Sequence, residues 1–112
     1  MLVAVAVLFF LQASDPSADG IKALEAQKYE QAAELFGKAL AADPKDYAAH
    51  FNLAFSYSML KRDPEAVTEY KKALDLKAGL YEAELNLGIL LIRDQQAAEA
   101  VSYLKAAAEQ KP

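Results

Sequence analysis

Residues 29–44 read YEQAAELFGKALAADP, and the pattern of this stretch comes back twice further along the chain. Ala32 recurs as Ala66 and Ala100, and each step is 34 residues with no insertion or deletion. A repeat of about this length that contains two helices predicts a solenoid, in which each unit buries its apolar face against its neighbours. The other positions that recur at this interval are Ala39, Ala73 and Ala107, then Phe36, Tyr70 and Leu104, then Leu40, Leu74 and Ala108.

A second set of small residues, upstream of the first in each unit, keeps the same interval: Gly20, Ala54 and Gly88. Each unit then closes at a fixed position, which holds Pro44, Ala78 and Pro112. On these residues the chain resembles the tetratricopeptide-repeat family, from about Ala13 to Pro112.

The resemblance implies an all-α fold, a right-handed α-solenoid of three helix-turn-helix repeats that follows a short apolar N-terminal segment. We expect the apolar segment at residues 1–13 and the repeat domain at 14–112, with repeats at about 13–46, 47–80 and 81–112. The small residues then let the two helices of a repeat approach closely, so we expect Gly20, Ala54 and Gly88 to face Ala32, Ala66 and Ala100. Phe36, Tyr70 and Leu104 would fill the wedge between helices.

Local signals predict where the helices begin and end. Asp15 or Ser14 can cap the first helix, Asp46 the third and Asp63 the fourth, with Pro64 in the first turn of that helix. Gly79 supplies a left-handed residue after the fourth helix, where the first unit has Asp43-Pro44 instead. The expected helices are 16–26, 30–42, 47–60, 64–76, 81–93 and 97–110.

Composition limits the function. A chain of 112 residues with 54% hydrophobic residues is one folded domain, and it has no cysteine for disulfides or thiolate metal sites. The net charge of −4 is spread along the chain and argues against nucleic acid as a partner. His50 is the only histidine, so no catalytic triad and no two-histidine metal site is available. We therefore expect no enzyme and no cofactor, and a packing or surface hydrogen-bonding role for His50.

Residues 2–11 are uninterrupted apolar residues, followed by Gln12-Ala13-Ser14. This pattern is typical of a secretory signal or an anchor, although no Lys or Arg precedes it. The protein is then exported, periplasmic or membrane-anchored; if the segment only packs on the repeats, the protein is cytoplasmic. A run of this length is too short to span a membrane as a helix.

The family resemblance also implies a concave surface, lined by the first helix of each repeat. Helical spacing selects the side chains on that surface. Asn52 and Asn86 occupy matching positions, where amides can hold an extended peptide backbone. We expect the surface to bind an apolar peptide or helix of a protein partner, in a scaffold or assembly role. The candidate groove residues are Ile21, Leu24, Phe51, Asn52, Phe55, Met59, Leu85, Asn86, Ile89, Ile92 and Arg93.

Some members of the family clamp a chaperone's C-terminal carboxylate with basic residues on this surface. Here the corresponding positions hold Ser17, Glu82 and Asn86, so we expect no such clamp.

The alternative is a self-assembling structural protein, a homo-oligomer formed through uncovered repeat ends. That expectation rests on Tyr103 and Leu104, with Leu87 and Leu91, as residues that lack a following repeat. Residues 2–11 would also find cover in the groove, and the short connection favours exchange between two copies.

Overall fold

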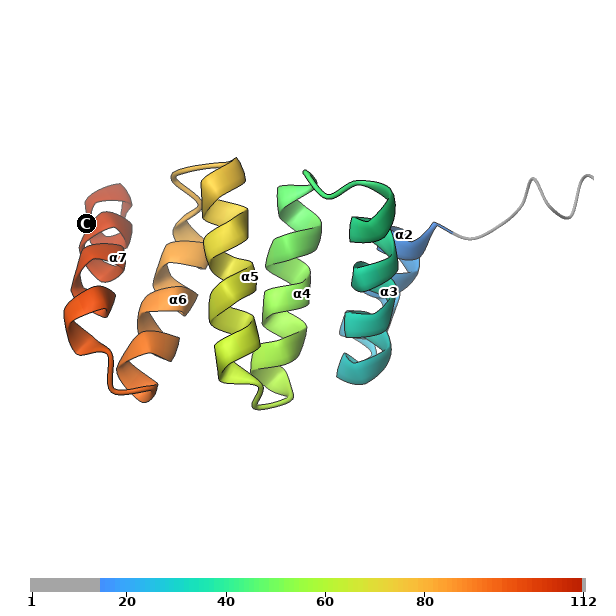
Figure 1. Cartoon of the computed structure of the whole chain (residues 1–112), viewed down its shortest axis with the longest axis horizontal. Coiled ribbons are helices and arrows are strands. Elements are labelled where there is room, and N and C mark those ends of the chain that lie inside the picture. The colour runs from blue at the N-terminus through green and yellow to red at the C-terminus, as the bar shows by residue number, and fades with distance from the viewer. Residues whose placement is uncertain (1–14, 112) are drawn as a thin grey trace, which may run out of the picture.

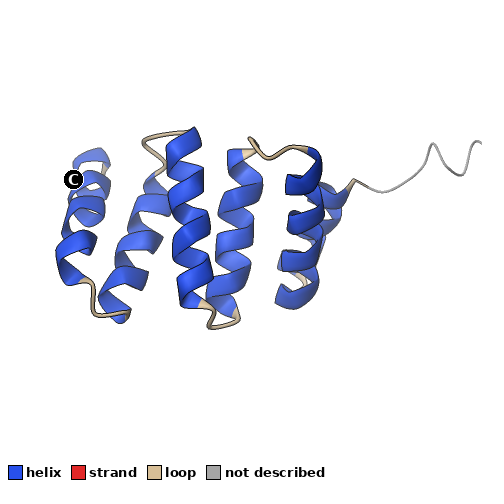
Figure 2. Ribbon diagram, in the orientation of Figure 1, coloured by secondary structure: helices blue, strands red, loops and turns tan. Residues whose placement is uncertain are grey.

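The computed structural model describes residues 15–111, and every regular element among them is an α-helix (Figures 1 and 2). Each helix packs on the next one along the chain, so that three antiparallel hairpins stack side by side. The predicted all-α solenoid is confirmed, and the predicted bounds agree within one or two residues. The helices are α2 (Pro16–Glu25), α3 (Tyr29–Ala42), α4 (Tyr47–Met59), α5 (Asp63–Leu76), α6 (Tyr81–Arg93) and α7 (Ala97–Gln110). The apolar segment 1–13 lies outside the described residues.

Two of the predicted caps are confirmed and one is wrong. Asp15 accepts the backbone N–H of Ser17, and Asp46 accepts that of Ala49, both at 3.1 Å. The helix α5 instead begins at Asp63 itself, without a side-chain cap. The Asp63 carboxylate instead accepts two hydrogen bonds from Arg93, thirty residues further on. A capping rule that considers only neighbouring residues cannot predict this partner.

The turn inside each hairpin contains a residue with positive φ, which the sequence did not suggest because none of the three is glycine. Gln27, Lys61 and Gln95 have φ of 59°, 63° and 61°, and they follow one another at the repeat interval. The next residue in each turn donates its N–H back to the helix, in the 6→1 pattern that closes helices ending in a left-handed residue. These bonds are Lys28 N–H to Ala23 O, Arg62 N–H to Tyr57 O and Gln96 N–H to Leu91 O.

The glycines of the first helices make room for the large residue of the second helix. A Cβ placed on Gly20 would lie 2.8 Å from the Phe36 ring, and one on Gly88 would lie 2.5 Å from Leu104. These side chains are the nearest neighbours of the two glycines, and Ala32 and Ala100, one helical turn earlier, are buried as well. Phe36 and Tyr70 are fully buried, as residues that fill the space between helices should be.

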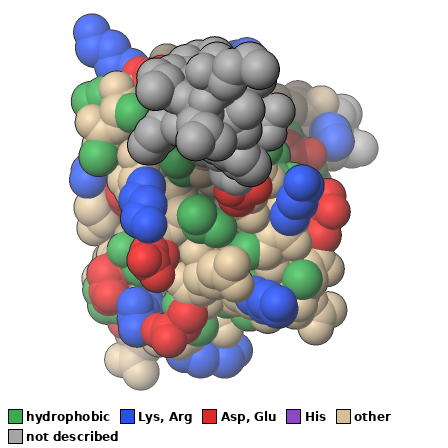
Figure 3. Space-filling model, turned by 90° about the vertical axis from the view of Figure 1, so that its right-hand side faces the viewer, with side chains coloured by type: hydrophobic (Ala, Val, Ile, Leu, Met, Phe, Trp, Pro, Cys, Tyr) green, Lys and Arg blue, Asp and Glu red, His purple; other side chains and the backbone are tan. Residues whose placement is uncertain are grey.

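The end of the solenoid formed by α2 and α3 is polar. Asp19 stands where the later repeats have the buried Leu53 and Leu87. Charged side chains of both signs are scattered over this end of the molecule (Figure 3). A polar outer face is what a terminal repeat needs when no repeat packs before it.

The far end does not expose the residues named for self-assembly. Leu87 and Leu91 are completely buried, while Tyr103 and Leu104 are half-buried against the same core. That expectation is wrong for Leu87 and Leu91, because the first helix of a repeat packs on the repeat before it, here on α5. Val101 on α7 is the large apolar residue left exposed at this end, at 61%.

Candidate functional site

The candidate site is the surface formed by the outward sides of α2, α4 and α6, which we call the groove face. It comprises the eleven groove residues named above together with Ala48, Ser58, Leu80 and Glu82. Six large apolar side chains are exposed among the described residues, and four of them lie on this face: Ile21, Met59, Ile89 and Ile92. The other two, Leu76 and Val101, lie elsewhere. Leu24, Phe51, Asn52, Phe55, Leu85 and Asn86 are half-buried, and Arg93 is exposed.

A hollow of about 230 Å³ opens between α4 and α6, where both helices begin. Its walls are mainly apolar, and Glu82 contributes a carboxylate. Only Phe51 and Asn52 of its lining were predicted. Extending the helical spacing one turn back from these two would have found Ala48, but Leu80 lies in a loop and carries no periodic signal. The lining residues are Tyr47, Ala48, Phe51, Asn52, Leu80 and Glu82.

A second, smaller hollow of about 100 Å³ lies between the same helices, nearer to where they end. It unites four predicted residues, Phe55 of α4 with Asn86, Ile89 and Arg93 of α6. The predicted residues Met59, Leu85 and Ile92 line neither of the two hollows. The complete lining is Phe55, Ser58, Tyr70, Asn86, Ile89, Leu90 and Arg93.

Aromatic residues of the second helices hold the two phenylalanines in place. The Phe51 ring meets Tyr70 of α5 edge-on, with centroids 5.5 Å apart, and the Phe55 ring meets Tyr29 of α3 at 6.4 Å. Such edge contacts are favourable for aromatic pairs. They explain why Phe51 and Phe55 are half-buried rather than freely exposed.

The two asparagines are not equivalent, although they occupy matching positions. Asn86 donates its Nδ2–H to the hydroxyl of Tyr70 at 3.2 Å. Burial raises the pKa of Tyr70 to about 12, so this hydroxyl stays neutral at ordinary pH. The Asn52 side chain has no such hydrogen bond within the part of the chain that the structure describes. Asn86 thus has one donor committed to Tyr70, whereas the Asn52 amide makes no side-chain hydrogen bond among residues 15–111.

The two charged side chains of the groove face, Arg93 and Glu82, differ in whether they form an ion pair. Arg93 donates two hydrogen bonds, of 2.7 and 2.8 Å, to the Asp63 carboxylate. These bonds raise the pKa of the guanidinium. Glu82 is exposed and forms no ion pair within residues 15–111. Lys77 lies near the larger hollow, but its ammonium is held over the Tyr47 ring at 4.8 Å.

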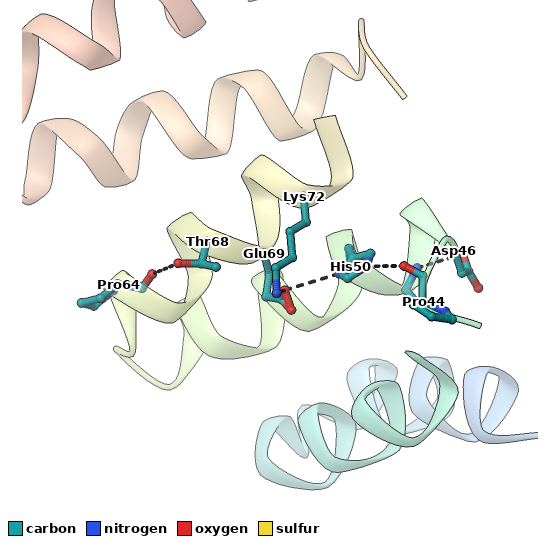
Figure 4. A network of polar contacts seen from close by, with 8 residues as sticks. Pro44, Asp46, His50, Pro64, Thr68, Glu69 and Lys72 are labelled. Atoms are coloured by element: carbon teal, nitrogen blue, oxygen red, sulfur yellow. Dashed lines mark hydrogen bonds and ion pairs between the residues drawn. The ribbon is translucent and has the colours of Figure 1, made fainter. Parts of the chain in front are cut away.

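His50 is buried and belongs to the framework of the fold (Figure 4). Its Nε2 lies 2.8 Å from the Pro44 carbonyl oxygen, and its Nδ1 lies 3.3 Å from Oε2 of Glu69. Lys72 approaches the same Oε2 at 3.5 Å. The packing role expected for His50 is confirmed, and with both nitrogens engaged the ring has no free nitrogen to activate a nucleophile.

Within residues 15–111, no group of three His, Asp or Glu side chains is placed to hold a metal ion. None of the helices the structure describes combines the length and apolar character needed to cross a membrane.

The comparisons with known proteins agree with this architecture. The family described as "Tetratricopeptide repeat" matches residues 23–71. A curated relative, the tetratricopeptide repeat and J domain-containing co-chaperone DNJ1 of Cryptococcus neoformans var. grubii, is 30% identical over 95% of this chain. The structure of MamA AMB-1 superposes with a TM-score of 0.80, at 26% identity over 84% of this chain. MamA from Desulfovibrio magneticus RS-1, at 21% identity over 84% of this chain and a TM-score of 0.79, shares the fold.

The relatives are longer than this chain. It covers 23% of the co-chaperone, 51% of MamA AMB-1 and 53% of the Desulfovibrio magneticus protein.

Proposed function

This chain is a member of the tetratricopeptide-repeat family, and on that premise we propose that it is a protein-interaction module with an apolar partner segment bound on its groove face. The role is that of a scaffold or assembly factor without catalysis or cofactor. The groove belongs to a repeat domain of residues 14–112, and residues 1–13 form a separate apolar segment that serves secretion or anchoring.

The observation that carries the proposal is the concentration of exposed apolar side chains on one face. Ile21, Met59, Ile89 and Ile92 are between 44% and 53% exposed, and they come from all three first helices. Contiguous apolar patches on a protein surface usually mark an interaction site. Covering each of these half-exposed side chains would contribute roughly 1–2 kcal/mol at about 25 cal/mol per Å².

Polar groups on the groove face fit a peptide better than a lipid-like ligand. The amide of Asn52, which has no side-chain hydrogen bond among residues 15–111, offers both a donor and an acceptor, and a peptide group needs one of each. It lies beside Phe51 on the wall of the larger hollow. An apolar side chain of the partner can enter this hollow while the neighbouring peptide group bonds to Asn52.

The charges argue against a carboxylate tail as the ligand. Arg93, a basic residue of the groove face, is already paired with Asp63, and Glu82 would repel a carboxylate near the larger hollow. The relative's name, co-chaperone, supports a protein as the partner. The groove chemistry favours an internal apolar segment of that protein over its C-terminus.

Selection of short random peptides displayed on phage, with the immobilised chain as bait, tests the proposal. We expect peptides rich in Leu, Ile, Phe and Val to be enriched, and to be lost when Phe55 is changed to Glu in the bait. Enrichment of acidic peptides, or an unchanged set on the Phe55→Glu bait, would contradict it.

A second candidate function is self-assembly into a homo-oligomer through the outer face of α7. Val101 stands at the position of Val67, which is half-buried at the joint between the second and third hairpins. A second copy that packs on Val101 would cover it in the same way. Light scattering on the purified chain should then show a mass above the monomer, which Val101→Glu reduces to the monomer.

A further inference from the structure

The chain itself contains a segment of the kind that the groove face would bind. Residues 2–11 are all apolar and uncharged. The walls of the larger hollow, formed by Ala48, Phe51 and Leu80, are apolar as well. An uncharged segment leaves Glu82 in water at the rim, so its binding costs no burial of an unpaired charge.

The path of the chain brings this segment to the correct edge of the solenoid. The helices α2, α4 and α6 all begin at the same edge, the upper one in Figure 1. The larger hollow opens at this edge, where α4 and α6 begin. Since α2 starts at Pro16, the described part of the chain begins at this edge and not at the opposite one.

The available length is sufficient. From Asp15 back to Leu11 the chain can extend at most about 14 Å, whereas packed helices lie about 8–10 Å apart. The helices α2 and α4 are in contact, so Leu11 can reach the surface of α4. Ten extended residues cover about 33 Å more, enough to continue from α4 to α6.

We propose that residues 2–11 occupy the groove face of their own chain and bind mainly in the larger hollow, where α4 and α6 begin. This inference rests on the proposed function, because it takes the groove face to be a site for apolar segments. It replaces exchange between two copies with an intramolecular contact, since the entry edge of the chain makes its own hollow the nearest one.

The consequence is competition between the segment and a partner. A partner must displace residues 2–11, so its apparent affinity falls by the fraction of molecules in which the groove face is free. Anything that withdraws the segment, such as cleavage or insertion into a membrane, opens the groove face.

Cross-linking in the full chain tests the proposal, because the chain has no cysteine of its own. One cysteine replaces Ala6, at the middle of the segment. The second replaces Ala48, an exposed residue on the wall of the larger hollow. The matched control pairs Ala6→Cys with Ala41→Cys, because Ala41 is exposed near the end of α3 at the same edge and lies off the groove face.

Under mild oxidation we expect the Ala6–Ala48 pair to form an intramolecular disulfide about tenfold faster than the Ala6–Ala41 pair, because binding raises the local concentration. Adding Ile89→Glu should remove this advantage, whereas Val101→Glu should keep it. Equal rates for the two pairs would overturn the proposal, and so would disulfides that form only between two copies.

The result can be separated from the test of the proposed function. If apolar peptides bind the groove face but the two pairs cross-link equally, the segment lies elsewhere and the proposed function stands. If apolar peptides also fail to bind, both are wrong.

Discussion

Glycine has opposite roles at different positions of this chain. Gly20 and Gly88 lie where a second helix approaches, and an added Cβ would collide with Phe36 or Leu104. Gly37 lies on the exposed side of α3, where an added Cβ would meet nothing within 4 Å. Glycine in a helix is less favourable than alanine. At Gly20 and Gly88 the close packing of the second helix offsets this cost, whereas at Gly37 nothing offsets it.

Alanine substitutions at these positions should therefore shift stability in opposite directions. We expect Gly37→Ala to raise the free energy of unfolding by about 0.5–1 kcal/mol, since it removes the cost of a helical glycine. Gly88→Ala should lower it by about 1–3 kcal/mol, since Leu104 has to move. Urea denaturation followed by circular dichroism measures both, and two changes of the same sign would contradict the packing described here.

The buried hydroxyl of Tyr70 should make stability depend on pH in the alkaline range. Burial raises its pKa from 10.0 to about 12, while the bond from Asn86 lowers it in part. Between these two values the unfolded chain has lost the proton and the folded chain retains it. The stabilisation is thus complete below pH 10 and decreases as the pH rises towards 12, by roughly 2–3 kcal/mol in total.

Urea denaturation at a series of pH values from 9 upwards measures this decrease. Tyr70→Phe retains the ring but has no ionisable proton, so its stability should fall less steeply over the same range. Identical slopes for the two proteins would show that Tyr70 is not the group responsible.

At the scale of the helices, the His50 network ties the start of α4 to α5 and to the loop before α4 (Figure 4). Its two partners, the Pro44 carbonyl and the Glu69 carboxylate, lie against different nitrogens of the ring, Nε2 and Nδ1. Glu69 is only 8% exposed, and its carboxylate depends on His50 and Lys72 for compensation.

His50→Ala should lower the free energy of unfolding by about 1–3 kcal/mol. The substitution removes the ring contacts to the Pro44 carbonyl and to the Glu69 carboxylate, so that Glu69 retains only Lys72. Lys72→Ala is the matched control. Its exposed side chain makes an ion pair worth about 0–1 kcal/mol. Equal losses in the two variants, measured by urea denaturation, would contradict a framework role for His50.

The helices could be predicted closely because their signals are local and repeated. The caps Asp15 and Asp46 and the left-handed Gly79 act within a few residues, and the alanines recur every 34 residues. The turns at Gln27, Lys61 and Gln95 gave no such signal, since residues without a glycine's freedom adopt positive φ only when the surrounding hairpin imposes it.

The groove residues could be predicted only as directions on a helix. Helical spacing predicts that the Phe55 side chain points outward. It does not predict that Tyr29 of α3 covers one side of the Phe55 ring. The same limit applies to Asn86, whose partner Tyr70 lies sixteen residues earlier. Contacts between helices decide how much of each side chain remains available, and a pattern within one helix does not contain them.

The whole molecule is a short solenoid whose surfaces differ in character. The end formed by α2 and α3 carries charges of both signs (Figure 3), whereas the groove face holds most of the large apolar side chains that are exposed among residues 15–111. A polar end discourages stacking of further copies on α2, and an apolar groove face favours capture of a segment. The proposed function accordingly places association on the groove face, with α7 as the second candidate site.

The most direct test compares two charged substitutions at exposed apolar residues, using an apolar peptide selected on the full chain. Ile89 is 49% exposed on the groove face, and Val101 is 61% exposed on α7. Fluorescence anisotropy should show that Ile89→Glu weakens binding of the labelled peptide at least about tenfold, a loss of about 1.4 kcal/mol. Val101→Glu should leave the affinity unchanged. Equal affinities for the two variants, or a loss confined to Val101→Glu, would contradict the groove face as the binding site.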